Sequence, residues 1–231
     1  MSRRFFESAP LGRKPPARRA PKPTIVVVCE GKVTEPRYFN AFKDLNGNGL
    51  VAVKPIGGCG VPVSVVERAI EEKAELVQKA RKSRDSFDAY FEVWAVFDRD
   101  AHPAGQVPRA FEMARQSGIR VAFSNPCFEL WGLMHYGCYS RPGHHHETQD
   151  ALKAAMSTYC HRRNPVFDMA VLDKLYDDAV KNAKRALEAR DAEQDSHGDP
   201  STTVFELTEQ IRLYGRPTGR APRSLSDLGR R

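Results

Sequence analysis

Three acidic residues directly follow two apolar segments of this 231-residue chain, and their spacing suits the binding of a cation. Glu30 follows the apolar residues 24–29, and Asp98 and Asp100 follow residues 91–97. Apolar runs of this length predict buried strands of a parallel sheet. Residues two apart on an extended chain face the same side, so we expect the two aspartates to converge. Because open α/β sheets bind ligands beyond the carboxyl ends of their strands, the three acids predict a site there.

The chemistry of such a site follows from the charge of its acids. Ionised carboxylates brought together in partly desolvated surroundings repel one another, and a hard divalent cation offsets that repulsion. Oxygen donors with room for water suit Mg²⁺ or Mn²⁺, which in turn bind substrate phosphates. One ion can polarise a phosphoryl group, and two can bracket the attacking and leaving oxygens. Either acidic motif alone is common in structural loops, but their joint placement at two strand ends favours a metal site.

Two further carboxylates lie near these strand ends. Glu35 begins a helix after the first strand, where the helix dipole alone would account for an acid. Glu129 lies four residues after Asn125, one residue too far for a capping box, and close to the end of a fourth strand. We expect Glu35 or Glu129 to be an auxiliary metal ligand, and Glu129 is also a candidate catalytic residue beside Glu30.

Basic residues are needed to hold a phosphate backbone beside these acids. Lys32 lies two positions after the first acid. Lys181, Lys184 and Arg185 recur at helical spacing and form a basic stripe that could contact phosphates. Such a stripe is more often a solvated helix face, and that alternative stays open.

The order of apolar patterns predicts an α/β fold with a mostly parallel, four-stranded sheet covered by helices on both faces. This core is predicted to span residues 24–137. Its predicted strands lie over 24–29, 51–56, 91–97 and 119–123, and its predicted helices over 36–43, 64–83 and 109–116. A further helix is expected to run to His135, with Asn125 as its N-cap and Pro126 at its first position.

Residues 138–214 have helical patterns and predict a C-terminal helical extension. Helices are expected over 149–159 and 168–191. Thr203 and Glu206 have the spacing of a capping box at the start of a last helix.

Basic charge is concentrated in the two ends of the chain. Residues 1–23 combine five prolines with a net charge of +6, and residues 215–231 carry +4, which leaves −3 between them. We expect a disordered basic arm and a basic tail. Either segment could neutralise phosphates of a nucleic acid, or serve only to keep the protein soluble.

Several classes of protein lack support in the sequence. No window holds eighteen consecutive apolar residues and no apolar signal segment begins the chain, so we expect a cytoplasmic protein that does not enter a membrane. The five cysteines are odd in number and never spaced as CxxC, which is typical of reduced thiols. There is no GxxxxGKS or GxxxxGKT segment, so any ATPase in this system is expected to be a partner subunit.

A run of histidines is the remaining candidate for a metal site. His144, His145 and His146 are adjacent in a polar segment, with His161 and two cysteines nearby in sequence. Imidazole and thiolate suit zinc, but the paired spacings of zinc sites are missing. We expect that adjacent histidines in a loop do not all face one ion, so a plain polar loop is favoured over zinc binding.

Three blocks of the sequence resemble the RloB-like proteins, which are themselves similar to the Toprim domains of topoisomerases, primases and nucleases. The blocks are "IVVVCEGKVTEPRYF" (25–39), "VWAVFDRD" (93–100) and "FSNPCFELWGLMH" (123–135), and the later segments "NAKRAL" (182–187) and "DPSTTVFEL" (199–207) extend the similarity. The resemblance implies a Toprim-like fold. It also implies that Glu30 acts as an acid/base or joins the metal site, and that Asp98 and Asp100 hold the metal.

The resemblance also implies a function. RloB-like proteins are associated with bacterial phage defence, and similarity to other defence-associated Toprim nucleases implies metal-dependent cleavage of nucleic acid. RNA, with tRNA among the candidates, is favoured over DNA. The alternative is a non-catalytic nucleic-acid-binding or regulatory subunit whose acids are structural. Strand rejoining ranks lower because it needs a tyrosine-bearing partner domain that this chain does not obviously contain.

Overall fold

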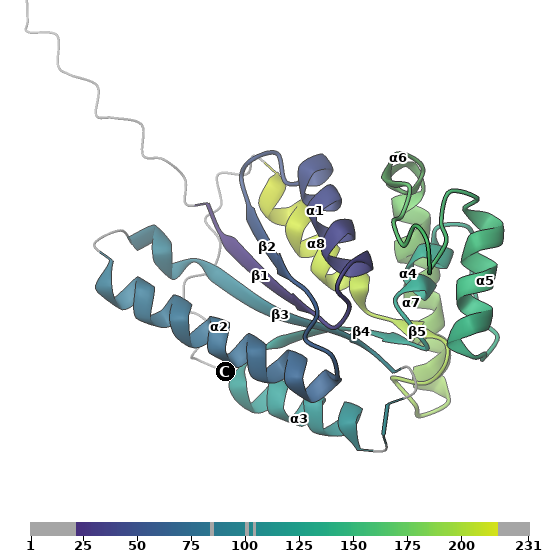
Figure 1. The fold of residues 1–231 in the computed structure, drawn as a ribbon, viewed down its shortest axis with the longest axis horizontal. Coiled ribbons are helices and arrows are strands. Elements are labelled where there is room, and N and C mark those ends of the chain that lie inside the picture. Colours follow the sequence, from purple (N-terminus) through teal and green to yellow (C-terminus); the bar gives the residue numbers. More distant parts are fainter. Residues whose placement is uncertain (1–21, 84–85, 100–101, 104, 217–231) are drawn as a thin grey trace, which may run out of the picture.

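A five-stranded sheet forms the centre of the computed structural model, which describes residues 22–83, 86–99, 102–103 and 105–216. In the spatial order β2-β1-β3-β4-β5, the strands are β2 (Ala52–Ile56), β1 (Thr24–Cys29), β3 (Phe91–Asp98), β4 (Arg120–Asn125) and β5 (Ser201–Thr202) (Figure 1). The first four are parallel and β5 is antiparallel to β4. The predicted α/β fold is confirmed, with one strand more than predicted. That strand was missed because two residues carry no periodic pattern.

Helices cover both faces of the sheet, as predicted. They are α1 (Thr34–Asn46), α2 (Pro62–Lys82), α3 (Gln106–Ser117), α4 (Glu129–Met134), α5 (His145–Ala155), α6 (Met169–Leu172), α7 (Tyr176–Ala192) and α8 (Val204–Gly215), with 3-10 turns η1 (Ser86–Ala89) and η2 (Asp173–Leu175). Figure 1 shows α2 and α3 on one face of the sheet and α1 and α8 on the other. None of the helices in the described ranges combines the length and apolar character that a membrane crossing requires.

Alternate residues of β1 enter two separate hydrophobic clusters. Val26 and Val28 pack with residues of α2 and α3, whereas Ile25, Val27 and Cys29 pack with residues of α1, α4, α5, α7 and α8. Burial on both faces explains why the strand is apolar throughout rather than alternating. The second cluster joins the helices of residues 138–214 to the face of the sheet that carries α1.

The predicted N-cap at Asn125 is wrong. Asn125 is the last residue of β4 and pairs with Ser201 of β5, the Asn125–Pro126 peptide bond is cis, and the helix begins only at Glu129. The side-chain amide of Asn125 donates instead to the carbonyl of His197 at 2.8 Å. The unpredicted β5 therefore determines the role of this residue.

The last helix, α8, begins after Thr203 as predicted, but the predicted capping box is wrong, and so is the single helix expected over 168–191. Thr203 makes no side-chain cap, because its Oγ1 accepts a hydrogen bond from the backbone N–H of Phe123 on β4 at 2.9 Å. The helix expected over 168–191 is divided into α6, η2 and α7, with Asp168 capping α6 through hydrogen bonds from the backbone of Ala170 and Val171. The basic segments 1–23 and 215–231 lie almost entirely outside the described residues.

His135, directly after α4, should make the fold sensitive to acid. Its side chain is buried, and burial lowers its pKa to about 4 from the ordinary 6.5, against the opposing hydrogen bond with Trp131. The unfolded chain therefore binds more protons between these two pH values. The contribution of neutral His135 to the free energy of unfolding should be fully present above about pH 6.5. The free energy of unfolding should decrease by up to about 3 kcal/mol as the pH falls to about 4. Urea unfolding at a series of pH values measures this loss.

The control is His135→Asn, whose amide can still donate to the Trp131 carbonyl but does not titrate. This variant should show a flatter dependence of unfolding free energy on pH over the same range. An identical slope in both proteins would contradict the assignment to His135.

Candidate active site

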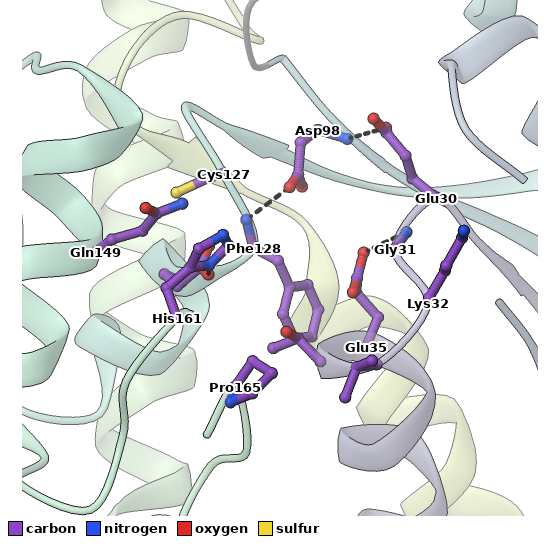
Figure 2. A pocket seen from close by; sticks show the side chains of 13 residues that line it. Glu30, Gly31, Lys32, Glu35, Asp98, Cys127, Phe128, Gln149, His161 and Pro165 are labelled. Carbon is purple, nitrogen blue, oxygen red and sulfur yellow. Dashed lines mark hydrogen bonds and ion pairs between the residues drawn. The ribbon is translucent and has the colours of Figure 1, made fainter. Parts of the chain in front are cut away.

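Four carboxylates line one cavity at the carboxyl edge of the parallel strands. The cavity has a volume of about 290 Å³, and its lining includes Glu30 after β1, Glu35 in α1, Asp98 at the end of β3 and Glu129 at the start of α4. Figure 2 shows the residues around it. The structure thus brings together four of the five acids singled out in the sequence, and the fifth, Asp100, lies outside the described residues.

Glu30 and Asp98 connect the ends of β1 and β3 with the turn before α4. Oε2 of Glu30 accepts a hydrogen bond from the backbone N–H of Asp98 at 3.2 Å, and Oδ2 of Asp98 accepts one from the N–H of Phe128 at 2.9 Å (Figure 2). His102 places Nε2 2.7 Å from Oε1 of Glu30. The buried strands bring these acids to one edge, and their own hydrogen bonds fix their positions there.

Gly31 allows Glu35 to approach the loop after β1. The backbone N–H of Gly31 donates to Oε1 of Glu35 at 2.9 Å, and a Cβ at Gly31 would lie only 2.3 Å from Oε2 of that carboxylate. The glycine-rich turn after β2 closes over the same loop, since Gly58 N–H donates to the Gly31 carbonyl at 2.9 Å and Gly60 N–H to the Glu30 carbonyl at 3.3 Å. A glycine therefore follows Glu30 because the Glu35 carboxylate packs closely against position 31.

Burial and neighbouring acids raise the proton affinity of Asp98 and Glu35. Burial raises the pKa of Asp98 well above its ordinary value, and the charges of Glu35, Glu30 and Glu129 raise it further. Burial also raises the pKa of Glu35, with a contribution from Glu129, while its backbone hydrogen bonds oppose the change. A cation in the cavity would offset this repulsion.

Glu129 differs from Asp98 and Glu35 because its pKa is lowered rather than raised. Burial acts to raise its pKa, but hydrogen bonds from His161, Tyr159 and Cys127 outweigh burial and leave the pKa below its ordinary value. Tyr159 donates its hydroxyl to Oε1 of Glu129 at 2.5 Å, and Nδ1 of His161 lies 2.9 Å from the same oxygen. The cavity thus contains two acids whose pKa is raised, Asp98 and Glu35, and one whose pKa is lowered, Glu129.

The donor set suits a hard divalent cation in chemistry and charge. Glu30, Glu35 and Asp98 offer carboxylate oxygens in a partly buried cavity, as Mg²⁺ and Mn²⁺ prefer. Across the part of the chain that the structure describes, no three of the acids have ligand oxygens within 4.8 Å of one another. One carboxylate oxygen of Glu30 and one of Asp98 each accept a hydrogen bond from a backbone N–H. Mutual repulsion between the carboxylates favours a separation of their oxygens larger than this limit.

Only one of the four predicted basic residues lines this cavity. Lys32 is exposed at its edge. Lys181 and Arg185 line a second cavity of about 510 Å³ beside Tyr136, and Lys184 places Nζ 5.6 Å from the ring centre of Phe205. The basic stripe on α7 is therefore not part of the acidic cavity.

The histidine run does not form a loop, contrary to the prediction. His144 caps α5 by accepting a hydrogen bond from the N–H of His146, while its own N–H donates to Glu147 at 3.1 Å. One ligand nitrogen from each of His144, His145 and His146 lies within 4.8 Å of the others. The predicted loop is wrong because His145 and His146 lie in the first turn of α5, whereas the expectation that the three histidines do not share one ion stays a prediction. All five cysteines are free thiols, as expected.

Three further polar residues at or beside the acids were missed as site residues by sequence reasoning. His102 contacts Glu30, and Tyr159 and His161 contact Glu129 across about thirty residues of chain. His161 entered the sequence analysis only as a zinc candidate. No local pattern indicates that the segment after α5 returns to the start of α4, so these contacts required the structure.

The fold and the cavity define a Toprim-like α/β protein with a cluster of acids at the carboxyl edge of its sheet. The model of the RloB-like protein family matches residues 25–211. The chain therefore belongs to the RloB-like protein family, as its sequence blocks indicated. Searches of curated proteins and of solved structures find no match to it.

Proposed function

We propose that this protein is a metal-dependent nuclease that hydrolyses phosphodiester bonds in nucleic acid. The observation that carries the proposal is the convergence of Glu30, Glu35 and Asp98 on one cavity, where burial and neighbouring negative charge raise the pKa of Asp98. A protein gains no stability from crowding acids in this way. Such a cluster is expected where a divalent cation and a phosphate bind.

Each acid has a role in this proposal. Glu30 and Asp98 would hold Mg²⁺ or Mn²⁺ together with Glu35, and family resemblance adds Asp100 as a ligand. A bound cation would polarise the phosphoryl group and neutralise its developing charge. Glu30, oriented by Asp98 N–H and His102, accepts a proton from the attacking water.

The proposed substrate class is supported by the family resemblance and by charge. Resemblance to defence-associated nucleases favours RNA, including tRNA, as the substrate and phage defence as the setting, with an ATPase subunit as a further partner. The basic ends of the chain and Lys32 supply positive charge for phosphates, while residues 24–214 carry −3. The alternative is a non-catalytic subunit that binds nucleic acid through its tails.

Incubation with nucleic acids distinguishes these functions. The protein is mixed with tRNA, total RNA, single-stranded DNA and duplex DNA, with Mg²⁺, Mn²⁺ or EDTA, and the ends formed are mapped. We expect cleavage of RNA that requires the metal. Binding that is unaffected by EDTA, with no product after prolonged incubation, would support the non-catalytic subunit instead.

Gly31→Ala should weaken metal binding by displacing Glu35. The added methyl group would meet the Glu35 carboxylate at 2.3 Å, so the side chain must leave its hydrogen bond with residue 31. We expect the affinity for Mn²⁺ to fall by about tenfold or more, the usual effect of disturbing the shell around a metal. Isothermal titration calorimetry measures the change.

A double-variant cycle provides the control for this prediction. In a Glu35→Ala background the methyl group has no carboxylate to displace, so Gly31→Ala should change Mn²⁺ affinity little further. If Gly31→Ala lowers the Mn²⁺ affinity by the same factor with and without the Glu35 carboxylate, the proposed contact does not explain the effect of the substitution.

A further inference from the structure

We propose that His161 is the general acid of the reaction, with Glu129 as its positioning residue. The proposal deepens the proposed function and rests on it. It assigns a proton donor for the leaving group, and it gives Glu129 a role distinct from metal binding. The evidence comes from the contacts of Glu129, from the exposure of the two side chains, and from their place in the cavity.

Glu129 is built into the structure as an acceptor for His161. Its side chain is 5 % exposed, whereas that of His161 is 50 % exposed, so the imidazole extends from a buried carboxylate to the cavity. Tyr159 and His161 both contact Oε1 of Glu129, at 2.5 and 2.9 Å. A buried carboxylate with two such partners is fixed in position, and it fixes the ring in turn.

The contact with Glu129 decides which ring nitrogen can serve as an acid. A carboxylate oxygen accepts at this 2.9 Å contact, so the geometry makes Nδ1 of His161 the donor and places a proton on Nδ1. The proton available for transfer to a substrate is then on Nε2. A buried carboxylate against Nδ1 orients an imidazole and stabilises its protonated form, as in catalytic carboxylate–histidine pairs generally.

The placement of His161 suits a role opposite Glu30. Figure 2 shows Glu30 and His161 at different sides of the cavity, with Asp98 and Phe128 between them. The two residues come from segments far apart in the chain, the end of β1 and the segment after α5. In-line displacement at phosphorus requires the attacking and leaving oxygens to lie on opposite sides, so a base and an acid are needed on two sides.

The step balances without any further reactant. A water oxygen forms a bond to phosphorus and gives one proton to Glu30. The bond from phosphorus to the leaving oxygen breaks, that oxygen keeps the electron pair, and it takes the proton from Nε2 of His161. The products are a phosphomonoester and a hydroxyl group. Proton exchange with solvent then restores the ionised glutamate and the protonated histidine, and nothing is oxidised or reduced.

A change of leaving group tests this role. Full-length wild-type protein and His161→Gln are compared, with Mn²⁺, on RNA and on a nucleoside p-nitrophenyl phosphodiester, whose phenolate leaves without protonation. We expect the variant to lose about 10²-fold or more on RNA, the usual contribution of a general acid, and less than about tenfold on the aryl ester. His146→Gln, an exposed histidine outside the cavity, should match wild type on both substrates.

The outcomes separate the two proposals. Equal losses on both substrates, or no loss on either, would overturn the role of His161 while leaving the nuclease assignment in place. Absence of metal-dependent cleavage by the wild-type protein on any nucleic acid would overturn the proposed function and this inference with it.

A second measurement does not depend on activity. In metal-free protein, proton NMR should show a downfield N–H resonance of His161, absent in His161→Gln and shifted in Glu129→Gln. Calorimetry should give Glu129→Gln a Mn²⁺ affinity within about twofold of wild type, whereas losing a ligand or its immediate support costs about tenfold or more. No shift of the resonance, or a loss of affinity of that size, would show that Glu129 does not act through His161.

Discussion

Asp98→Asn should lower metal-dependent RNA cleavage by about 10³-fold or more, because a metal ligand supports several kcal/mol of transition-state stabilisation. The asparagine oxygen can still accept the hydrogen bond that Asp98 receives from Phe128 N–H, so the local structure is kept. Single-turnover cleavage of RNA in Mg²⁺ or Mn²⁺ measures the loss. Retention of cleavage by this variant would contradict the assignment of Asp98 to the metal.

The stability of Asp98→Asn gives an independent check. The substitution removes a buried charge that faces Glu35, Glu30 and Glu129, so in EDTA the variant should be at least as stable as wild type. The combination of lost activity and undiminished stability is expected of an acid retained for function. Asp44→Asn, an exposed carboxylate on α1, should leave both properties unchanged.

Glu30→Gln should lower cleavage by about 10²–10⁴-fold, the range expected when a general base is removed. A glutamine oxygen can still accept the N–H of Asp98, which keeps the ends of β1 and β3 connected. The variant should therefore fold normally, as circular dichroism and thermal unfolding would show. Its cleavage rate is measured on the same RNA and at the same metal concentration as wild type.

The matched control for Glu30→Gln is Glu67→Gln, which changes an exposed glutamate on α2 outside the cavity. This control should cleave at the wild-type rate. If Glu30→Gln also did so, Glu30 would be a structural residue that only holds the end of β3, and the base would have to be found elsewhere.

The strands and the acids after them could be predicted because their signals are local. Residues 24–29 form β1 within the predicted bounds, and β3 differs from its prediction only by including Asp98. Continuous apolar runs identify strands buried on both faces, and parallel topology then places Glu30 and Asp98 at the same edge. The location of the cavity follows from these two facts alone.

Features that depend on distant segments could not be predicted. Thr203 has the sequence of a helix cap, but its hydroxyl oxygen accepts from β4, so a tertiary contact replaces the local one. The contact of His161 with Glu129 likewise joins segments separated by α5. The sequence shows Gly31 only as a residue typical of turns. The structure shows that a glycine is required at this position because the Glu35 carboxylate packs against it.

The central claim, that the cavity acids bind a divalent cation, is tested most directly by locating Mn²⁺ in crystals of the full-length protein by anomalous diffraction. The account predicts a peak in contact with the carboxylates of Glu30 and Asp98. Absence of a peak there at a Mn²⁺ concentration that supports cleavage, or a peak only at His144, His145 and His146, would contradict it.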